Sequence, residues 1–149
     1  MTEKTVDRWF SKFIRLRDSS LEFGEFDGRG SEMLAGDCCT CGKIVRIWDL
    51  ENGWNPSAHC GHFIGRYFKS TRYDEQNCHL QCQKCNTFAE GKQFEHGLFI
   101  DKKYGAGTAE KILIKSKQLC KRNRNDLKWL SDHYRKKAQE LAKQKGIKL

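Results

Sequence analysis

Two Cys-x2-Cys pairs, Cys38/Cys41 and Cys82/Cys85, are the residues of this chain whose spacing most directly predicts chemistry. Each pair presents two thiolates from one tight turn, and two pairs complete the tetrahedral set of four sulfur ligands that Zn²⁺ prefers. Cys39 is an alternative first ligand, but Cys39-x-Cys41 is not the usual spacing. The pattern therefore predicts a structural zinc ion held by Cys38, Cys41, Cys82 and Cys85.

Two histidines, His59 and His62, lie between these pairs, and three uses of them stay open. A neutral imidazole can accept a proton from water near pH 7, which suits the general base of a hydrolytic reaction. Imidazole and thiol groups can also hold a second structural zinc, either Cys60 with His62 or His59 with Cys78 or His79. Simple packing is the third use. The first use predicts an enzyme, and the second predicts a noncatalytic module.

The positive charge of the chain is concentrated near its C-terminus. Residues 111–149 carry 13 Lys and Arg against three acidic residues, whereas residues 1–110 carry 15 against 16. A basic segment of this kind can neutralise several phosphates and so bind nucleic acid with little dependence on its sequence. We therefore expect Lys121, Arg122 and Arg124 to contact DNA. A solvated helical face is the alternative.

The composition predicts one small domain in a reducing compartment. With 149 residues, of which 38% are hydrophobic, the core is modest and would depend on the metal for stability. The N-terminal segment is charged and does not resemble a signal peptide, and no apolar run approaches the ~18 residues of a membrane span. We therefore expect a cytoplasmic protein in which the other cysteines are buried or free thiols rather than disulfides, namely Cys39, Cys60, Cys78 and Cys120.

The elements that must position these residues follow from the periodicity of the apolar side chains. Helical spacing of Val6, Trp9, Phe10 and Phe13 predicts a helix that Thr5 caps. The glycine-rich, acidic segment 19–37 is expected to be a loop. Further along the chain we expect a strand over 43–48, a turn at 52–53, a histidine-bearing strand within 54–64, a connection over 66–77 to a second strand, a helix over 83–92 that resumes past Gly91, and helices over 108–117 and 126–145.

Together these residues carry a resemblance. The order of paired cysteines, two histidines, Asn77, paired cysteines and Asn86 resembles the zinc-containing HNH, or ββα-metal, nucleases, which include phage endonuclease VII. Five segments are more closely similar to the phage lambda NinG (Rap) recombination family: 9–11, 58–63, 71–77, 81–86 and 103–105. The resemblance implies an α+β fold, with an N-terminal helix and a small zinc-stabilised HNH core over residues 1–107 and a basic helical extension over 108–149.

The resemblance also implies catalytic roles for individual residues. His62 is the general base, and Asn77 fixes the loop that orients the histidine strand. His59 and Asn86 are ligands of one catalytic divalent cation, Mg²⁺ or Mn²⁺, which acts in addition to the structural Zn²⁺. The ion stabilises the charge that gathers on the phosphate during hydrolysis.

Two arginines lie in the connection that follows the histidine strand. Arg66 and Arg72 are expected to contact phosphate, because guanidinium groups form forked, charge-assisted bonds to phosphate oxygens. Ion pairing of these arginines with Asp74 or Glu75 is the alternative.

One position departs from the pattern of the related resolvases, which have an aspartate where this chain has His59. His59 and Asn86 bring no negative charge, and imidazole favours Mn²⁺ over Mg²⁺. We therefore expect Mn²⁺ to support activity at lower concentration than Mg²⁺. Glu90, one helical turn past Asn86, is a candidate for the missing carboxylate.

The favoured function is a structure-specific DNA endonuclease that nicks branched recombination intermediates, such as Holliday junctions and D-loops, by metal-dependent phosphodiester hydrolysis. A generic HNH DNase of the restriction or homing type and a noncatalytic double-zinc DNA-binding module are the alternatives. The expected partner is branched DNA, and no membrane is involved. The near two-fold symmetry of a junction predicts a homodimer, with either the N-terminal apolar stripe or the C-terminal helix at its interface.

Overall fold

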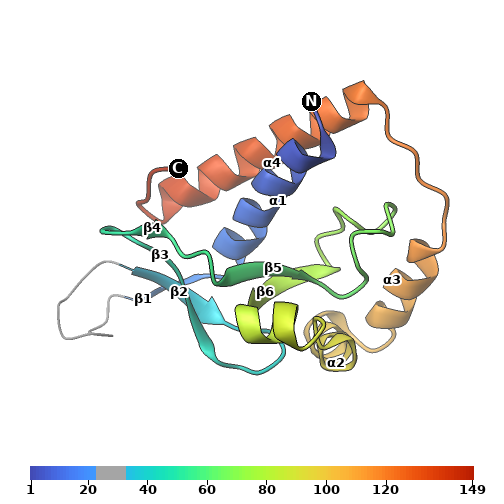
Figure 1. Cartoon of the computed structure of the whole chain (residues 1–149), viewed down its shortest axis with the longest axis horizontal. Coiled ribbons are helices and arrows are strands. Elements are labelled where there is room, and N and C mark those ends of the chain that lie inside the picture. The colour runs from blue at the N-terminus through green and yellow to red at the C-terminus, as the bar shows by residue number, and fades with distance from the viewer. Residues whose placement is uncertain (23–32) are drawn as a thin grey trace.

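The chain folds into a mixed α+β structure with two small antiparallel sheets, as Figure 1 shows. This computed structural model describes residues 1–22 and 33–149. The α+β class predicted from the sequence is confirmed. None of the described helices combines the length and the apolar character that crossing a membrane requires. In chain order the elements are α1 (Glu3–Arg17), β1 (Ser20–Glu22), β2 (Met33–Asp37), β3 (Ile44–Asp49), β4 (Gly53–Trp54), β5 (Ala58–His62), β6 (Cys78–Cys82), the π-helix η1 (Lys84–Phe88), α2 (Gln93–Tyr104), α3 (Thr108–Ser116) and α4 (Arg124–Gln144).

Helix α1 forms from the predicted amphipathic stripe, but it begins earlier than expected. Thr2 occupies the N-cap position with extended backbone angles, and Thr5 lies inside the helix. The expected cap at Thr5 was therefore wrong, because the sequence offers two threonines and the helix starts after the first. The stripe faces the core through the buried side chains of Val6, Phe10, Phe13, Ile14 and Leu16.

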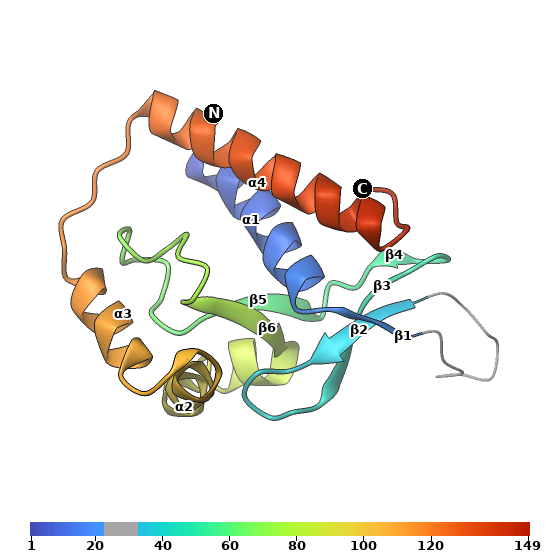
Figure 2. The same ribbon diagram turned by 180° about the vertical axis from the view of Figure 1, so that it is seen from behind.

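Helix α4 lies alongside α1, as both views show (Figures 1 and 2). It starts at Arg124 rather than at 126, because Asn123 and Asp126 form a capping box in which each side chain accepts a backbone N–H of the other residue. The Tyr134 ring meets Phe10 edge-on, with centroids 4.8 Å apart. The apolar faces of α1 and α4, both expected as possible dimer interfaces, thus pack against each other within one chain.

The larger sheet has the strand order β1-β2-β3-β4. The expectation of a loop over 19–37 was wrong at both ends, where β1 and β2 pair antiparallel, and its middle part, 23–32, lies outside the described residues. The buried residues Leu34, Ala35 and Gly36 explain this strand. A Cβ at Gly36 would approach the Asp18 carbonyl oxygen to 2.5 Å, so glycine is needed where β2 passes the end of α1.

The smaller sheet is a hairpin of β5 and β6 that lies between α1 and η1 (Figure 1). The register pairs Ala58 with Cys82 and His62 with Cys78. The predicted order of strand, loop, strand and helix is present, although the helix over 83–92 ends earlier than expected. It stops after Phe88, because the backbone at Glu90, Gly91 and Lys92 is left-handed, with φ of 52°, 80° and 46°. Helix α2 then resumes past this turn, as predicted.

Candidate functional site

The four cysteines of the two pairs meet in one cluster, although 40 residues separate the pairs. The sulfur atoms of Cys38, Cys41, Cys82 and Cys85 all lie within 4.8 Å of one another. The Sγ atoms of Cys41 and Cys82 are 3.9 Å apart. Zinc–sulfur bonds of ~2.3 Å in a tetrahedron place sulfur atoms ~3.8 Å apart. The cluster can therefore hold a zinc ion, and Cys38 rather than Cys39 belongs to it.

The environment of these thiols suits a cation. Burial raises the pKa of the Cys38 thiol, but hydrogen bonds from the Thr40 hydroxyl and the Cys82 amide outweigh it and lower that pKa to about 6. Burial and the neighbouring thiols raise the pKa of Cys85 to about 12. One thiolate thus opposes the ionisation of the next, and a divalent ion supplies the positive charge that lets all four ionise.

His62, at the end of β5, is held with one ring nitrogen free. Its Nε2 lies 3.0 Å from the Arg72 carbonyl oxygen, and a carbonyl only accepts, so Nε2 carries the proton and Nδ1 keeps its lone pair. Burial lowers the pKa of His62 to about 4, against the raising effects of the Arg72 carbonyl and the Asp7 carboxylate. The imidazole is therefore neutral at pH 7.

Asn77 is fully buried and holds the loop that follows β5. Its Oδ1 accepts the Ile64 amide at 2.8 Å, and its Nδ2 donates to the carbonyl oxygens of Ile64 and Thr71 at 2.9 and 3.0 Å. The Arg72 carbonyl that binds His62 is the next one along the chain. Asn77 thus acts on His62 through the backbone and does not itself touch a reacting group.

His59 and Asn86 come together from β5 and η1. The Asn86 Nδ2 donates to His59 Nδ1 at 2.9 Å, while His59 Nε2 donates to the Pro56 carbonyl. Two ligands of one small cation at ~2.1 Å lie about 3 Å apart, and a half-turn of the Asn86 amide would present its oxygen beside His59 Nδ1. The pair therefore fits a divalent cation. Burial and the positive charge of Arg15 lower the pKa of His59, which favours the neutral imidazole that can bind a metal.

A cleft of about 230 Å³ joins these groups. His59, Cys60, His62, Arg66 and Asn86 line one part of it, and the polar side of α1 lines the other with Asp7, Ser11 and Arg15. The contribution of α1 was not found from the sequence. The only signal was that polar residues occupy the face of α1 opposite its apolar stripe, which does not say what that face meets.

Arg72 lies beneath this cleft in a network of carboxylates. It donates Nε and Nη2 to Asp7 at 3.0 and 2.6 Å and Nη1 to Glu3 at 2.9 Å. The ion pair expected with Asp74 or Glu75 was wrong, because the loop folds back onto α1. With both edges of its guanidinium engaged, Arg72 positions Asp7 and is not the phosphate contact that was expected.

Glu90 is exposed, and it is not one of the described residues that line the cleft. The left-handed turn that ends η1 directs the chain away from the helical phase that would have placed Glu90 one turn above Asn86. Glu90 therefore does not supply the missing carboxylate.

The second zinc site expected from His59 with Cys78 or His79 does not form. His79 is fully buried on the other side of the hairpin, with Nδ1 3.0 Å from His96 Nε2 and Nε2 2.8 Å from the Tyr104 hydroxyl. Burial lowers the pKa of His79 to about 2 and that of His96 to about 4. These two neutral imidazoles form a buried hydrogen bond that links β6 to α2.

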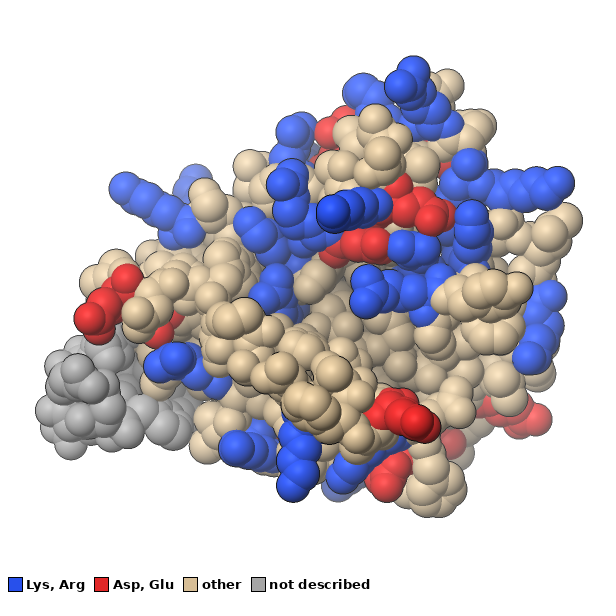
Figure 3. Space-filling model, in the orientation of Figure 1, with Lys and Arg blue, Asp and Glu red and all other residues tan. Residues whose placement is uncertain are grey.

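The basic side chains of the C-terminal region lie on the outside of the molecule. Figure 3 shows Lys and Arg spread over the half of this face where Figure 1 draws α1, α4 and the segment that leads into α4, with a few acidic residues between them. Lys121 and Arg124 are exposed. Arg122 is instead tied down, because it donates to the Lys69 carbonyl at 2.6 Å and its guanidinium lies over the Tyr73 ring.

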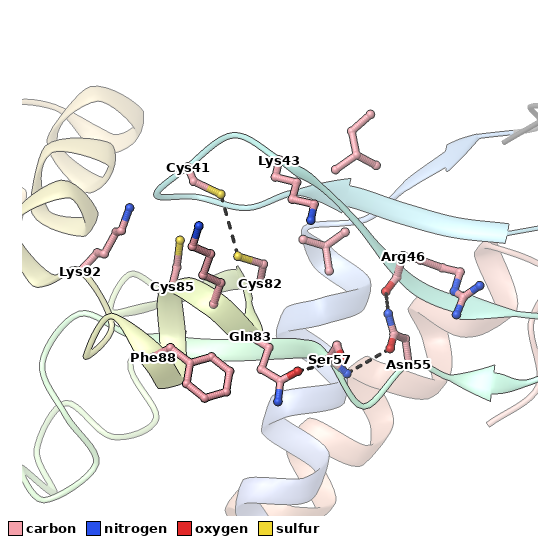
Figure 4. A pocket seen from close by; sticks show the side chains of 13 residues that line it. Cys41, Lys43, Arg46, Asn55, Ser57, Cys82, Gln83, Cys85, Phe88 and Lys92 are labelled. Carbon is pink, nitrogen blue, oxygen red and sulfur yellow. Dashed lines mark hydrogen bonds between the residues drawn. The ribbon is translucent and has the colours of Figure 1, made fainter.

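A second basic surface lies beside the cysteine cluster. This basic groove, about 650 Å³ in volume, runs between β3 and η1 (Figure 4). Four cationic side chains and an aromatic ring line it, and no acidic residue does so among the described part of the chain: Lys43, Arg46, Lys84, Lys92 and Phe88. The Phe88 ring is 75% exposed. The sequence had placed the positive excess only in the C-terminal region.

Comparison with known proteins identifies one family. The sequence model of the bacteriophage lambda NinG protein matches residues 2–144, which is nearly the whole chain. No curated protein matches the chain, and no solved structure does either. The match includes both cysteine pairs, the hairpin histidines, and helices α1 and α4. The chain therefore belongs to the bacteriophage lambda NinG family, which is associated with phage recombination.

Proposed function

We propose that this protein is a metal-dependent DNA endonuclease of the HNH type that nicks branched recombination intermediates. The observation that carries the proposal is the state of His62, which is neutral, fixed by the Arg72 carbonyl and part of the lining of a polar cleft. Positioned, uncharged imidazole is the group that phosphodiester hydrolysis needs to take a proton from water.

His59 and Asn86 are the proposed holders of a divalent cation in the same cleft. When bound, the ion stabilises the negative charge on the phosphate and on the leaving oxygen. His62 Nδ1 accepts the proton of the attacking water, and the bond from Nε2 to Arg72 keeps the ring in the tautomer that allows this. Arg66 is exposed at the cleft and is the proposed phosphate contact.

DNA would meet the protein on two basic surfaces that flank this cleft. Lys121 and Arg124 are exposed where the chain enters α4, and the basic groove lies between β3 and η1. Exposed Phe88 offers a ring on which a base can stack. Surfaces on both sides of one cleft suit the diverging arms of a branched substrate better than one straight duplex.

A second copy of the chain is the proposed partner for a four-way junction, whose two cuts are related by near two-fold symmetry. The exposed apolar side chains of α2 and α3 form one candidate interface, chiefly Phe94, Leu98, Leu113 and Ile114. Light scattering of the wild type and of Leu98→Glu tests this: a dimer that becomes a monomer supports the interface, and an unchanged mass removes it.

The test of the activity compares a labelled four-way junction with its linear arms, in Mn²⁺ and in chelator, for the wild type and for His62→Ala. We expect metal-dependent nicks near the branch that fall by roughly 10²–10⁴-fold in His62→Ala. His133→Ala is the matched control, because His133 stacks on Trp129 on α4. Equal nicking by His62→Ala would overturn the proposal, and a preference for linear duplex would favour a generic HNH DNase.

One observation favours a second candidate function, a noncatalytic zinc module that binds DNA. Cys60, His62 and Cys78 offer metal-binding atoms that all lie within 4.8 Å of one another. Binding of the junction without cleavage, by the wild type and by His62→Ala alike, would support this module.

A further inference from the structure

The hairpin carries a group of ligand atoms of which the proposed reaction uses only His62. Cys60 and His62 are two residues apart on β5 and so point to the same face, and Cys78 is the cross-strand partner of His62. Their two sulfur atoms and one imidazole nitrogen lie within 4.8 Å of one another. This is the same spacing limit that the four-cysteine cluster meets, on a hairpin whose geometry is fixed by its backbone pairing.

We propose that Cys60, His62 and Cys78 form a second metal site, selective for soft divalent ions such as Zn²⁺, and that an ion there switches the nuclease off. The site has three protein ligands, and Cys60 and His62 also line the cleft. An ion can therefore enter from the cleft, and water can complete its tetrahedron.

The charge balance of this site permits an ion where Cys78 is fully buried. Two thiolates and one neutral imidazole carry two negative charges, which equal the charge of Zn²⁺, so the filled site is neutral. Loss of two thiol protons accompanies binding. Thiolate ligands select Zn²⁺ and Co²⁺, whereas Mg²⁺ and Mn²⁺ prefer the oxygen and imidazole donors of Asn86 and His59.

Occupancy and catalysis exclude each other because both need His62. A metal on Nδ1 takes the lone pair that would accept the proton from water. A metal on Nε2 instead displaces the bond to the Arg72 carbonyl that fixes the ring. In either case the general base is lost while the cysteine cluster and the His59–Asn86 pair stay in place.

The metal site is tested first, without any cleavage. Protein loaded with one equivalent of Zn²⁺ is titrated with Co²⁺, and thiolate-to-cobalt and tetrahedral ligand-field absorption is recorded. We expect one further equivalent in the wild type and in the control variants Cys39→Ser and Cys120→Ser. In Cys60→Ser and Cys78→Ser the affinity of the second site for Co²⁺ should fall by more than roughly 10–100-fold. That range is typical for loss of a hydrogen-bond partner of a ligand, and loss of a ligand itself should cost more.

Cys78→Ser can fail to fold because Cys78 is buried, so partly exposed Cys60→Ser decides the result, with its thermal melt as a check. Absence of a second equivalent in the wild type, or unchanged bands in Cys60→Ser, overturns the site.

The inhibitory effect rests on the proposed function and has its own test. Zn²⁺ is added to Mn²⁺-supported nicking, and each protein is compared with its own rate before zinc. The wild type should lose at least about tenfold of its rate as the second site fills, and Cys60→Ser should keep its rate. Undiminished nicking at full occupancy overturns the inhibition. If neither protein nicks in any metal, the proposed function fails, while the cobalt bands still decide the site.

Discussion

The cysteine cluster and the cleft share the same hairpin and are built in different ways. Cys82 stands opposite Ala58 at one end of the β5–β6 pair, and Cys78 stands opposite His62 at the other. The cluster takes all its ligands from two tight turns. The cleft takes its lining from α1, β5, η1 and the loop between the strands. The comparison shows that one hairpin carries two separate sets of residues: one forms the cysteine cluster that can hold zinc, and the other lines the cleft in which we propose catalysis.

The largest effect is expected from the cluster. Cys85→Ser should leave the chain unfolded at 25 °C, because structural zinc contributes ~10–16 kcal/mol in small zinc domains, as much as the ~5–15 kcal/mol total stability of a typical domain. Circular dichroism melts with metal analysis measure this. Cys39→Ser, outside the cluster, should melt like the wild type. A cooperative melt of zinc-free Cys85→Ser would show that the fold does not depend on zinc at the cysteine cluster.

Asn77→Ala is expected to lower both the stability of the fold and the proposed nicking activity. It removes the partners of a buried amide and two buried carbonyls, which costs on the order of 3 kcal/mol in urea unfolding, and it loosens the loop that holds His62. Nicking should therefore fall while the ligands of both metals remain. Exposed Gln76→Ala is the control. Full activity in Asn77→Ala would show that the loop held by Asn77 is not needed to position His62.

Part of the response to acid is expected from His62 on β5 and His96 on α2. Burial lowers the pKa of His62 and His96 to about 4, below the ~6.5 of an unfolded chain, so the unfolded state binds more protons between these values. Their contribution to stability is present above pH 6.5 and is lost as the pH falls to 4, by roughly 3 kcal/mol for each group. Unfolding of His96→Gln across this range should show a smaller loss than the wild type. Equal losses would show that His96 does not contribute to the acid response.

His59→Asp sharpens the description of the cleft. The carboxylate supplies a hard oxygen ligand, so the Mg²⁺ concentration for half-maximal nicking should fall on the order of tenfold. The wild type should need less Mn²⁺ than Mg²⁺. A metal titration of both proteins measures this, with the melting temperature as a check that the cluster is intact. A wild type that works equally well at limiting Mg²⁺ contradicts the role given to His59.

The smallest effect is expected in the basic groove. Lys84→Ala should lower the slope of log K against log salt by about 0.9 for each lost phosphate contact and leave the melt unchanged. Binding of a fluorescent junction at several salt concentrations measures the slope. Lys102→Ala removes an equal charge from exposed α2 and is the control. Identical slopes for both variants would show that DNA does not enter the groove.

The sequence predicted the cluster because four cysteines with fixed spacing leave few alternatives. It also predicted the hairpin and the helices with strong apolar periodicity, α1 and α4. It could not place Asp7 in the cleft or pair Arg72 with Asp7, because those residues are 65 positions apart and meet only through the packing of α1. Strands β1 and β2 were missed because glycine and acidic residues dominate their surroundings, while only Leu34 and Ala35 show the burial.

The pairing of α1 with α4 also sets an order of events during synthesis. The first helix supplies a wall of the cleft, yet part of its apolar stripe is covered by α4, which follows all the other described elements in the chain. Until α4 has emerged, α1 can pack on the hairpin, but the side of its stripe that α4 covers stays exposed. The cysteine cluster, which ends at Cys85, can therefore assemble during synthesis before the cleft of the proposed nuclease has its α1 wall fixed by α4.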